Sequence, residues 1–150
     1  MSDASIFNCD KDDFVIPNES PWKEKMRLFD LYQVAYTPWE WHREKFDLSK
    51  SIGLEIISSP FDFSAIDFLE ELDCVDYKIA CPKISDIGLI ERAAQTNKPV
   101  MLSSGATNLE DLLLAVKTLK DNGCKEYIFQ NRTNDYSASP ELCDLSTIAD

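Results

Sequence analysis

The sequence predicts an α/β fold built on a parallel sheet, and two observations lead to this prediction. Four short apolar runs are centred near Ile57, Lys78, Leu102 and Phe129, which are 21, 24 and 27 residues apart. Segments with the apolar spacing of helices, roughly 11–15 residues long, lie between these runs. Short strands that alternate with such helices are typical of βαβ units, in which neighbouring strands run parallel.

The first third of the chain is less regular. Residues 1–37 form an irregular lead-in, in which only 25–36 has the apolar spacing of a short helix. Pro38 suits the first turn of an amphipathic helix over 39–52, and Gly53 follows as its stop. We therefore expect one domain over 1–150, with the lead-in over 1–37 and a helix followed by βα units over 38–150.

From Gly53 onward the expected strands and helices alternate. Ser85 or Asp86, and Asn108, are residues that cap helix N-termini, and Gly123 suits a helix end. The expected strands are 54–58, 76–81, 99–103 and 125–130, and the expected helices are 62–72, 85–96 and 108–122.

The composition limits the partners and the cell compartment that we expect for this chain. The chain has 15 Lys and Arg against 27 Asp and Glu, a net charge of −12, which argues against nucleic acid and anionic membranes as partners. No apolar run reaches the ~18 residues that cross a membrane, and no signal peptide is visible. The five cysteines are odd in number and form no Cys-x-x-Cys pair, which favours a reducing compartment over disulfides or structural zinc. We expect a cytoplasmic protein.

His42 is the only histidine. A catalytic or metal site that needs two histidines therefore cannot be built from this chain alone. His42 follows two tryptophans near the start of a predicted helix, which favours a packed, structural histidine over a catalytic base.

Small polar residues follow each predicted strand at its carboxyl end, where parallel α/β folds bind ligands. Hydroxyls, amides and helix N-termini at such an edge suit a phosphate or a carboxylate. Residues of these types are also common in βα turns that bind nothing. The polar segments are 58–62, 81–83, 103–105 and 130–136.

Lys78 is the most informative single residue. It lies inside the apolar run Tyr77-Lys78-Ile79-Ala80, and an ammonium inside a sheet needs an anion or loses its proton. Lys78 is therefore an anion-binding lysine, a Schiff-base lysine, or a strand-edge lysine paired with a nearby Asp or Glu. Lys83 and Lys98 lie in predicted loops, where we expect them to be solvated.

Several longer motifs carry a family resemblance. They are 28–32 (Leu-Phe-Asp-Leu-Tyr), 36–42 (Tyr-Thr-Pro-Trp-Glu-Trp-His), 58–62 (Ser-Ser-Pro-Phe-Asp), 67–72 (Asp-Phe-Leu-Glu-Glu-Leu) and 77–80 (Tyr-Lys-Ile-Ala). Their order and spacing resemble the sialic acid synthase family, which includes N-acetylneuraminate synthase. The runs at 38–42 and 58–62 are closest to its pseudaminic acid synthase branch.

The resemblance implies a TIM (β/α)₈ barrel of which this chain is the middle portion, incomplete at both ends. It implies condensation of phosphoenolpyruvate with an N-acetylated amino sugar, giving a 2-keto acid and releasing phosphate. For a complete family member it also implies a divalent metal, Mn or Mg, held by two histidines that would follow residue 150. We expect no cofactor and no metal ligands in this chain itself.

The resemblance also assigns site residues, by their positions in the matching motifs. The resemblance implies that phosphoenolpyruvate contacts Lys78, Ser59, Ser103, Asn134 and Cys81, and that the sugar contacts Tyr136 and Lys83. Cys81-Pro82-Lys83 stands where the family usually has Ser-Phe-Glu, so a thiol replaces a hydroxyl and a cation replaces a carboxylate. No catalytic residue is assigned within the chain.

The leading functional hypothesis is a partial synthase that is inactive as this chain alone. A homo-oligomer or a complementary fragment would have to supply the missing strands, since half a barrel leaves strand edges unpaired. The alternatives are a non-catalytic pseudoenzyme or binding module, and a Schiff-base aldolase that uses Lys78 as its nucleophile.

Overall fold

A computed structural model describes residues 11–16, 27–105, 107–133 and 140–142. The helices of these segments are α1 (Leu28–Ala35), α2 (Glu40–Ser51), α3 (Phe63–Glu71), α4 (Ile87–Ala94) and α5 (Leu109–Asp121). The strands are β1 (Tyr77–Ile79), β2 (Val100–Ser103) and β3 (Tyr127–Gln130). Short 3-10 turns lie at Asp12–Phe14, Cys81–Lys83 and Pro140–Leu142. No helix in this part of the chain is both long enough and apolar enough to cross a membrane.

The three strands form one parallel sheet in the order β1-β2-β3. Lys78 is level with Met101, and Met101 is level with Ile128 on β3. One step further along, Ser103 is level with Gln130. The α/β fold with parallel strands predicted from the sequence is thereby confirmed.

The strand predicted over 54–58 is wrong in extent. Only Ser58 pairs with β1, through a parallel bridge to Tyr77 in which the Lys78 N–H donates to the Ser58 carbonyl at 3.0 Å. Leu54 and Ile57 are 62% and 39% exposed. The described residues place β1 on one side of this run and no strand on the other, so little fixes its backbone in an extended ladder.

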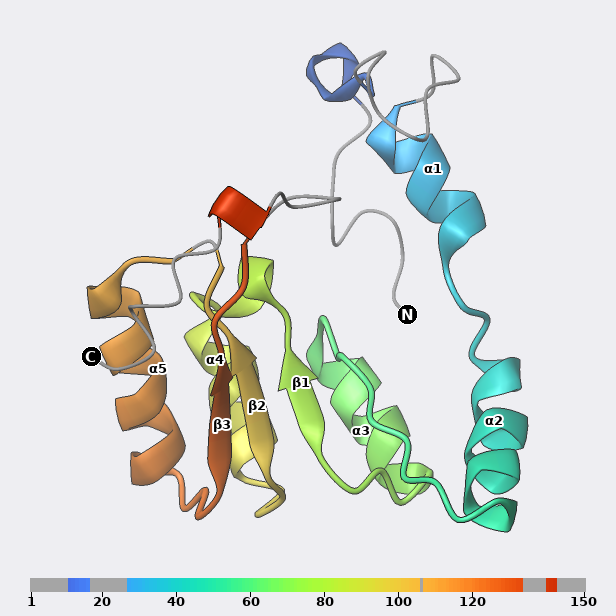
Figure 1. Cartoon of the computed structure of the whole chain (residues 1–150). Coiled ribbons are helices and arrows are strands. Elements are labelled where there is room, and N and C mark those ends of the chain that lie inside the picture. The colour runs from blue at the N-terminus through green and yellow to red at the C-terminus, as the bar shows by residue number, and fades with distance from the viewer. Residues whose placement is uncertain (1–10, 17–26, 106, 134–139, 143–150) are drawn as a thin grey trace.

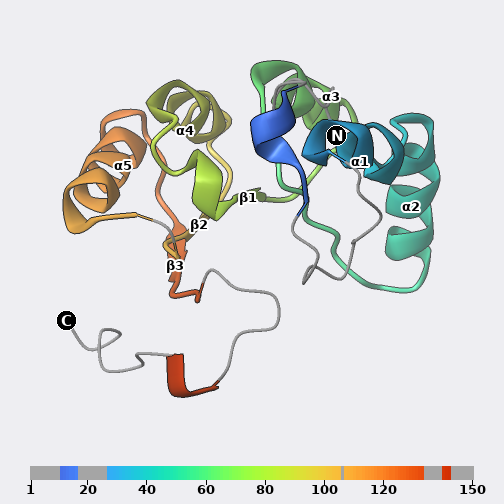
Figure 2. The same ribbon diagram turned by 90° about the horizontal axis from the view of Figure 1, so that it is seen from above.

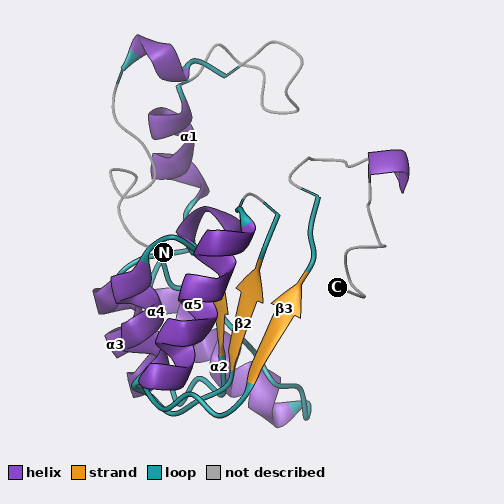
Figure 3. Cartoon of the chain, turned by 90° about the vertical axis from the view of Figure 1, so that its left-hand side faces the viewer, coloured by secondary structure: helices purple, strands orange, loops and turns teal. Residues whose placement is uncertain are grey.

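Helices α3, α4 and α5 cover one face of the sheet, which Figure 2 shows from above and Figure 3 from the side. Each helix begins at a residue whose side chain accepts a backbone N–H: Asp62 from Ala65 at 2.8 Å, Asp86 from Leu89 at 3.2 Å and Asn108 from Asp111 at 2.8 Å. Such caps satisfy N–H groups that have no partner inside the helix. The predicted caps Asp86 and Asn108 are therefore confirmed.

The hydrophobic core lies between these helices and the sheet. Tyr77, Ile79 and Leu102 point into it from the strands and are fully buried. From the helices come the following buried side chains: Ile66, Leu69, Leu89, Ile90, Ala93, Ala94, Ala115 and Leu119. Tyr77 also donates its hydroxyl proton to Glu70 of α3, and Lys98 pairs with the same carboxylate at 2.5 Å, so polar contacts link α3 to the sheet as well.

The other face of the sheet has no α-helix over it among the described residues, and the short 3-10 turn Pro140–Leu142 lies on that side (Figure 2). Helix α2 lies beside α3, where Trp39 stacks on Phe68 with ring centroids 4.5 Å apart and Phe46 is buried. Helix α1 lies beyond the carboxyl ends of the strands (Figures 1 and 3). A ligand could therefore reach the predicted site residues from the open face of the sheet or from the carboxyl edge of its strands.

Candidate functional site

Lys78 lies on the open face of the sheet. Its neighbours Tyr77 and Ile79 are buried under the helices, and successive side chains of a strand point to opposite faces. Lys78 is half-buried, and no ion pair or hydrogen bond within the described part of the chain involves its ammonium. The interpretation of Lys78 as a strand-edge lysine paired with Asp or Glu is thus not supported by any described residue.

Ser103 lies on the same face at the carboxyl end of β2. It is 1% exposed, and the preceding Leu102 points into the core. The Ser103 hydroxyl donates to Oε1 of Gln130 across the strand pair at 3.4 Å. The next residue, Ser104, donates both its N–H and its hydroxyl to the Gln130 carbonyl, at 3.0 and 3.2 Å. The ends of β2 and β3 are therefore held together by three hydrogen bonds around Gln130.

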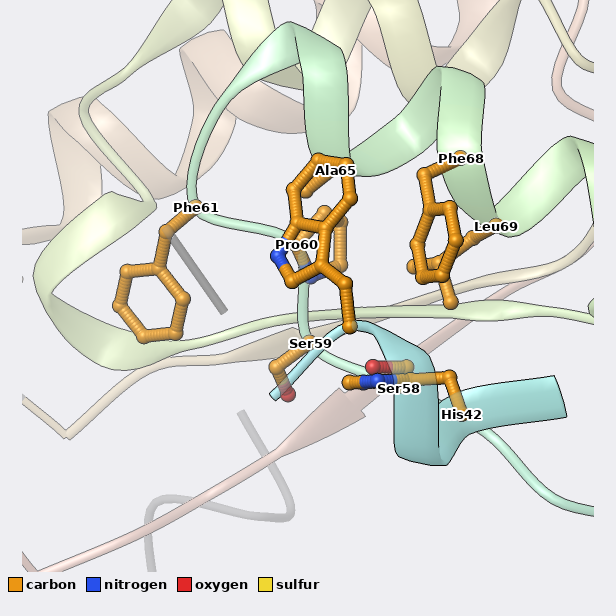
Figure 4. A pocket seen from close by; sticks show the side chains of 9 residues that line it. His42, Ser58, Ser59, Pro60, Phe61, Ala65, Phe68 and Leu69 are labelled. Carbon is orange, nitrogen blue, oxygen red and sulfur yellow. The ribbon is translucent and has the colours of Figure 1, made fainter. Parts of the chain in front are cut away.

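Ser59 lies one strand across from Lys78. Because Ser58 is bridged to Tyr77, the following residues, Ser59 and Lys78, are level with one another. Ser59 is half-buried, and Figure 4 shows its hydroxyl turned away from Phe68 and Leu69. A cavity of about 20 Å³ lies between this segment, α2 and α3, which has room for a water molecule and not for a substrate.

His42 borders the same cavity and has a structural environment. Its Nδ1 lies 3.1 Å from the Pro38 carbonyl oxygen, and its ring packs edge-on against Phe68 at 5.5 Å between centroids. Burial lowers the pKa of His42 from its ordinary value of 6.5. These contacts agree with the interpretation of His42 as a packed histidine.

Cys81 and Lys83 form the 3-10 turn that follows β1. The Cys81 sulfur accepts the Gly105 N–H at 3.3 Å, which ties the end of β1 to the turn after β2. A Cβ atom at Gly105 would lie 2.5 Å from the Arg132 carbonyl oxygen, so only glycine allows the turn to approach the chain after β3 this closely.

The expectation that Lys83 and Lys98 are solvated is wrong. Lys83 pairs with Asp86 at 3.2 Å and its side chain is only 20% exposed. Lys98 pairs with Glu70 at 2.5 Å. In both cases an acidic side chain of a neighbouring helix or its cap lies within reach of the ammonium, which the loop assignment did not take into account.

The structure thus brings together part of the predicted set. Lys78, Ser103 and Ser59 share the open face, while Cys81 lies at the carboxyl edge and Lys83 is held by the cap of α4. Asn134 and Tyr136 lie outside the described residues. Gln130 was not among the predicted site residues, although it begins the polar segment 130–136 that follows the last predicted strand.

A metal centre is the remaining part of the expected site. Among the described residues, no group of three or more His, Cys, Asp or Glu side chains is arranged to hold a metal ion.

Comparison with known proteins shows the family to which this chain belongs. A sequence model of the NeuB family matches residues 2–150. The chain belongs to the NeuB family. The pseudaminic acid synthase of Helicobacter pylori is 47% identical over 109 residues, which are 71% of this chain and 32% of that protein. A pseudaminic acid synthase of Campylobacter jejuni is 33% identical over 146 residues, which are 97% of this chain and 42% of that protein.

Solved structures show the fold of this NeuB-family chain. The N-acetylneuraminic acid synthetase of Leptospira borgpetersenii superposes with a TM-score of 0.76 at 24% identity, over 81% of this chain and 42% of that one. The DAHP synthase of Thermotoga maritima superposes with a TM-score of 0.64 at 18% identity, over 77% of this chain and 37% of that one. The prediction of a part of a TIM-type barrel is confirmed, and the chain spans less than half the length of these relatives.

Proposed function

We propose that this chain carries part of the phosphoenolpyruvate site of a nonulosonic acid synthase. The enzyme would join phosphoenolpyruvate to the open-chain aldehyde of an N-acetylated amino sugar with the consumption of one water molecule, giving a 2-keto acid and inorganic phosphate. One observation carries the proposal: Lys78 presents a half-buried ammonium, without an ion pair in the described part of the chain, on the sheet face that also holds Ser103. The pseudaminic acid synthases among the relatives support the class of sugar.

The chemistry of the ligand fits this face. Phosphoenolpyruvate carries a carboxylate and a phosphate, and such anions are bound best by charge-assisted hydrogen bonds. Lys78 supplies the charge, and the hydroxyls of Ser103 and Ser59 supply neutral donors. The strand backbone holds Lys78 and Ser103 in place before the ligand arrives, so binding orders few groups.

The part assigned to this chain is binding and orientation. Fixing phosphoenolpyruvate against the sheet presents its terminal carbon to the aldehyde carbon, where the new carbon–carbon bond forms. Because the chain spans 32% and 42% of the two synthases compared, the remaining groups of the site belong to residues outside it. Contact of the sugar with Tyr136 and Lys83, and of phosphoenolpyruvate with Asn134 and Cys81, stays a prediction.

Isothermal titration calorimetry of the 150-residue chain with phosphoenolpyruvate tests the proposal. We expect the wild-type chain to bind, and Lys78→Met to bind at least about tenfold more weakly, because one charge-assisted contact is lost. The matched control is Lys117→Met, which removes the same charge from an exposed position on α5 and should leave binding unchanged. Wild-type affinity in Lys78→Met, or no binding by the wild-type chain, would contradict the proposal.

The two other hypotheses predict different results. A Schiff-base aldolase would give a covalent adduct at Lys78 when a 2-keto acid is added with borohydride, whereas simple anion binding leaves the lysine unmodified. A binding module would bind phosphoenolpyruvate without consuming it, even when the rest of the barrel is supplied. Mass spectrometry of the lysine and a phosphate-release assay separate these outcomes.

A further inference from the structure

Gln130 ends β3 beside the predicted site. It is level with Ser103 in the register of the sheet and half-buried. Its side-chain Oε1 accepts the Ser103 hydroxyl proton at 3.4 Å, and its carbonyl accepts both the N–H and the hydroxyl of Ser104. Gln130 is thus the residue to which the carboxyl end of β2 is attached.

The side-chain amide of Gln130 has two N–H donors that are not used in hydrogen bonds to other described residues. A glutamine amide offers one acceptor oxygen and an NH₂ group with two donors. Only the oxygen is used here, and no hydrogen bond from the Gln130 Nε2 occurs within the described residues. The unused donors belong to an amide whose other end contacts Ser103, so they lie on the open face of the sheet.

The surroundings of this amide favour an anion. Ala80, Ser103 and Gln130 form one level of the open face, and Lys78, Met101 and Ile128 form the level below it. These six residues include a cation and no carboxylate. Lys78 is separated from Ser103 by two residues along the strands, ~6.6 Å, and by one strand, ~4.8 Å, which a lysine side chain can span.

The hydroxyl and the amide constrain one another. While the Ser103 hydroxyl donates to Oε1, its proton is unavailable to a ligand, and the Gln130 NH₂ is the free donor. If the amide turns by half a rotation, its NH₂ donates to the Ser103 oxygen, and the Ser103 hydroxyl proton becomes free for the ligand. In either orientation the pair offers a donor to the open face, and the Gln130 amide decides which group supplies it.

We propose that Gln130 and Ser103 act as one donor pair for an anionic oxygen of phosphoenolpyruvate, with the Gln130 amide setting which of the two donates. This inference rests on the proposed function and adds a binding residue to it. The pair donates to the phosphate or to the carboxylate, and inorganic phosphate and pyruvate, used as separate ligands, report which group it holds.

The first test is calorimetry on the full chain. Gln130→Met keeps the length of the side chain and removes the amide, and we expect it to weaken phosphoenolpyruvate binding about tenfold. Gln95→Met is the matched control, since Gln95 is exposed at the end of α4, where its side-chain amide donates to Glu91 and Asn122. Ser103→Ala combined with Gln130→Met should cost less than the sum of the single changes, because coupled groups are not additive.

The second measurement needs no variant to bind. In ¹⁵N-labelled wild-type chain, the side-chain NH₂ signals of Gln130, assigned by their loss in Gln130→Met, should shift when phosphoenolpyruvate is added, while those of Gln95 stay. A purely structural Gln130 would give no such selective shift. Unshifted Gln130 signals, or wild-type affinity in Gln130→Met while Lys78→Met is weakened, would overturn this inference and leave the proposed function standing. No binding by wild type would overturn both.

Discussion

The two faces of the same three strands differ in kind. On the face under α3, α4 and α5, Tyr77, Ile79 and Leu102 are fully buried. On the open face, one residue away in each case, stand Lys78 and Ser103, with Gln130 beside them on β3. Alternation along a strand separates the two sets completely. The helix-covered face supplies the buried apolar side chains of the core, while the open face holds polar groups, among them a Lys78 ammonium that has no ion pair among the described residues.

The open face also contains a polar group that destabilises the fold, the carboxylate of Asp76. Asp76, two residues before Lys78 and therefore on the same face, has a carboxylate oxygen that is shielded from solvent and has no hydrogen-bond partner among the described residues. A buried polar atom without a partner is destabilising. On the helix-covered face the Tyr77 hydroxyl donates to Glu70, so the polar group at that position has a partner.

The largest effect is expected from the helix-covered face. Leu102→Ala removes a fully buried side chain between β2 and the helices and should lower the free energy of unfolding by about 3 kcal/mol, through lost burial and the cavity left behind. Urea denaturation followed by circular dichroism measures this loss. The matched control is Met101→Ala on the open face of the same strand, where the side chain is only half-buried. Equal losses at the two positions would contradict the distinction between the faces.

A smaller effect of opposite sign is expected at Asp76. Burial raises the pKa of its carboxyl above the ordinary 3.8, and the charge of Glu55 raises it further. The folded chain therefore holds the Asp76 proton more tightly than the unfolded chain does, and this contribution to stability is present at low pH and lost as the pH rises through the raised pKa. At pH 7 the ionised carboxylate destabilises the fold, so Asp76→Asn should raise the free energy of unfolding, by less than about 1 kcal/mol because solvent screens a partly exposed carboxylate.

Comparison of wild type with Asp76→Asn at two pH values tests the direction of this effect. Denaturation of wild type and Asp76→Asn at pH 7 and at pH 3 should show the gain at pH 7 and little or none at pH 3, where the wild-type carboxyl is protonated. Glu55→Gln should give part of the gain, because it removes only the repulsion. A variant that is less stable than wild type at pH 7 would show that the Asp76 carboxylate has a stabilising role on the open face.

The sequence predicts most of what local patterns determine. The helices after residue 38, their caps Asp86 and Asn108, and three of the four expected strands follow from apolar spacing and from capping residues. The segment 54–58 was predicted as a strand from its apolar composition, but only Ser58 pairs, with Tyr77 of β1. Composition does not show whether a second strand is present to pair with a segment.

The site was predictable only in part, for a related reason. Lys78 could be found because a charge inside an apolar run is visible in the sequence. The partner of Lys98 could not, because Glu70 lies 28 residues away in the chain. Gln130 lies in the polar segment 130–136, but its contact with Ser103 follows from the register that sets the two residues level. Register across parallel strands is not readable from either segment alone. Asn134 and Tyr136 lie outside the described residues and stay predictions.

The smallest effect on stability is expected where the effect on binding is proposed to be large. Lys78→Met keeps the aliphatic stem that packs on the sheet and removes an ammonium that has no ion pair among the described residues, so the free energy of unfolding should change by no more than about 0.5 kcal/mol. Urea denaturation beside Leu102→Ala measures the difference. A loss above about 1.5 kcal/mol would mean that Lys78 is held by a stabilising contact of the fold, and an ammonium used in that way is not available to an anion. A change near zero, in the variant that also loses phosphoenolpyruvate, would show that the open face binds the ligand at positions that contribute little to folding.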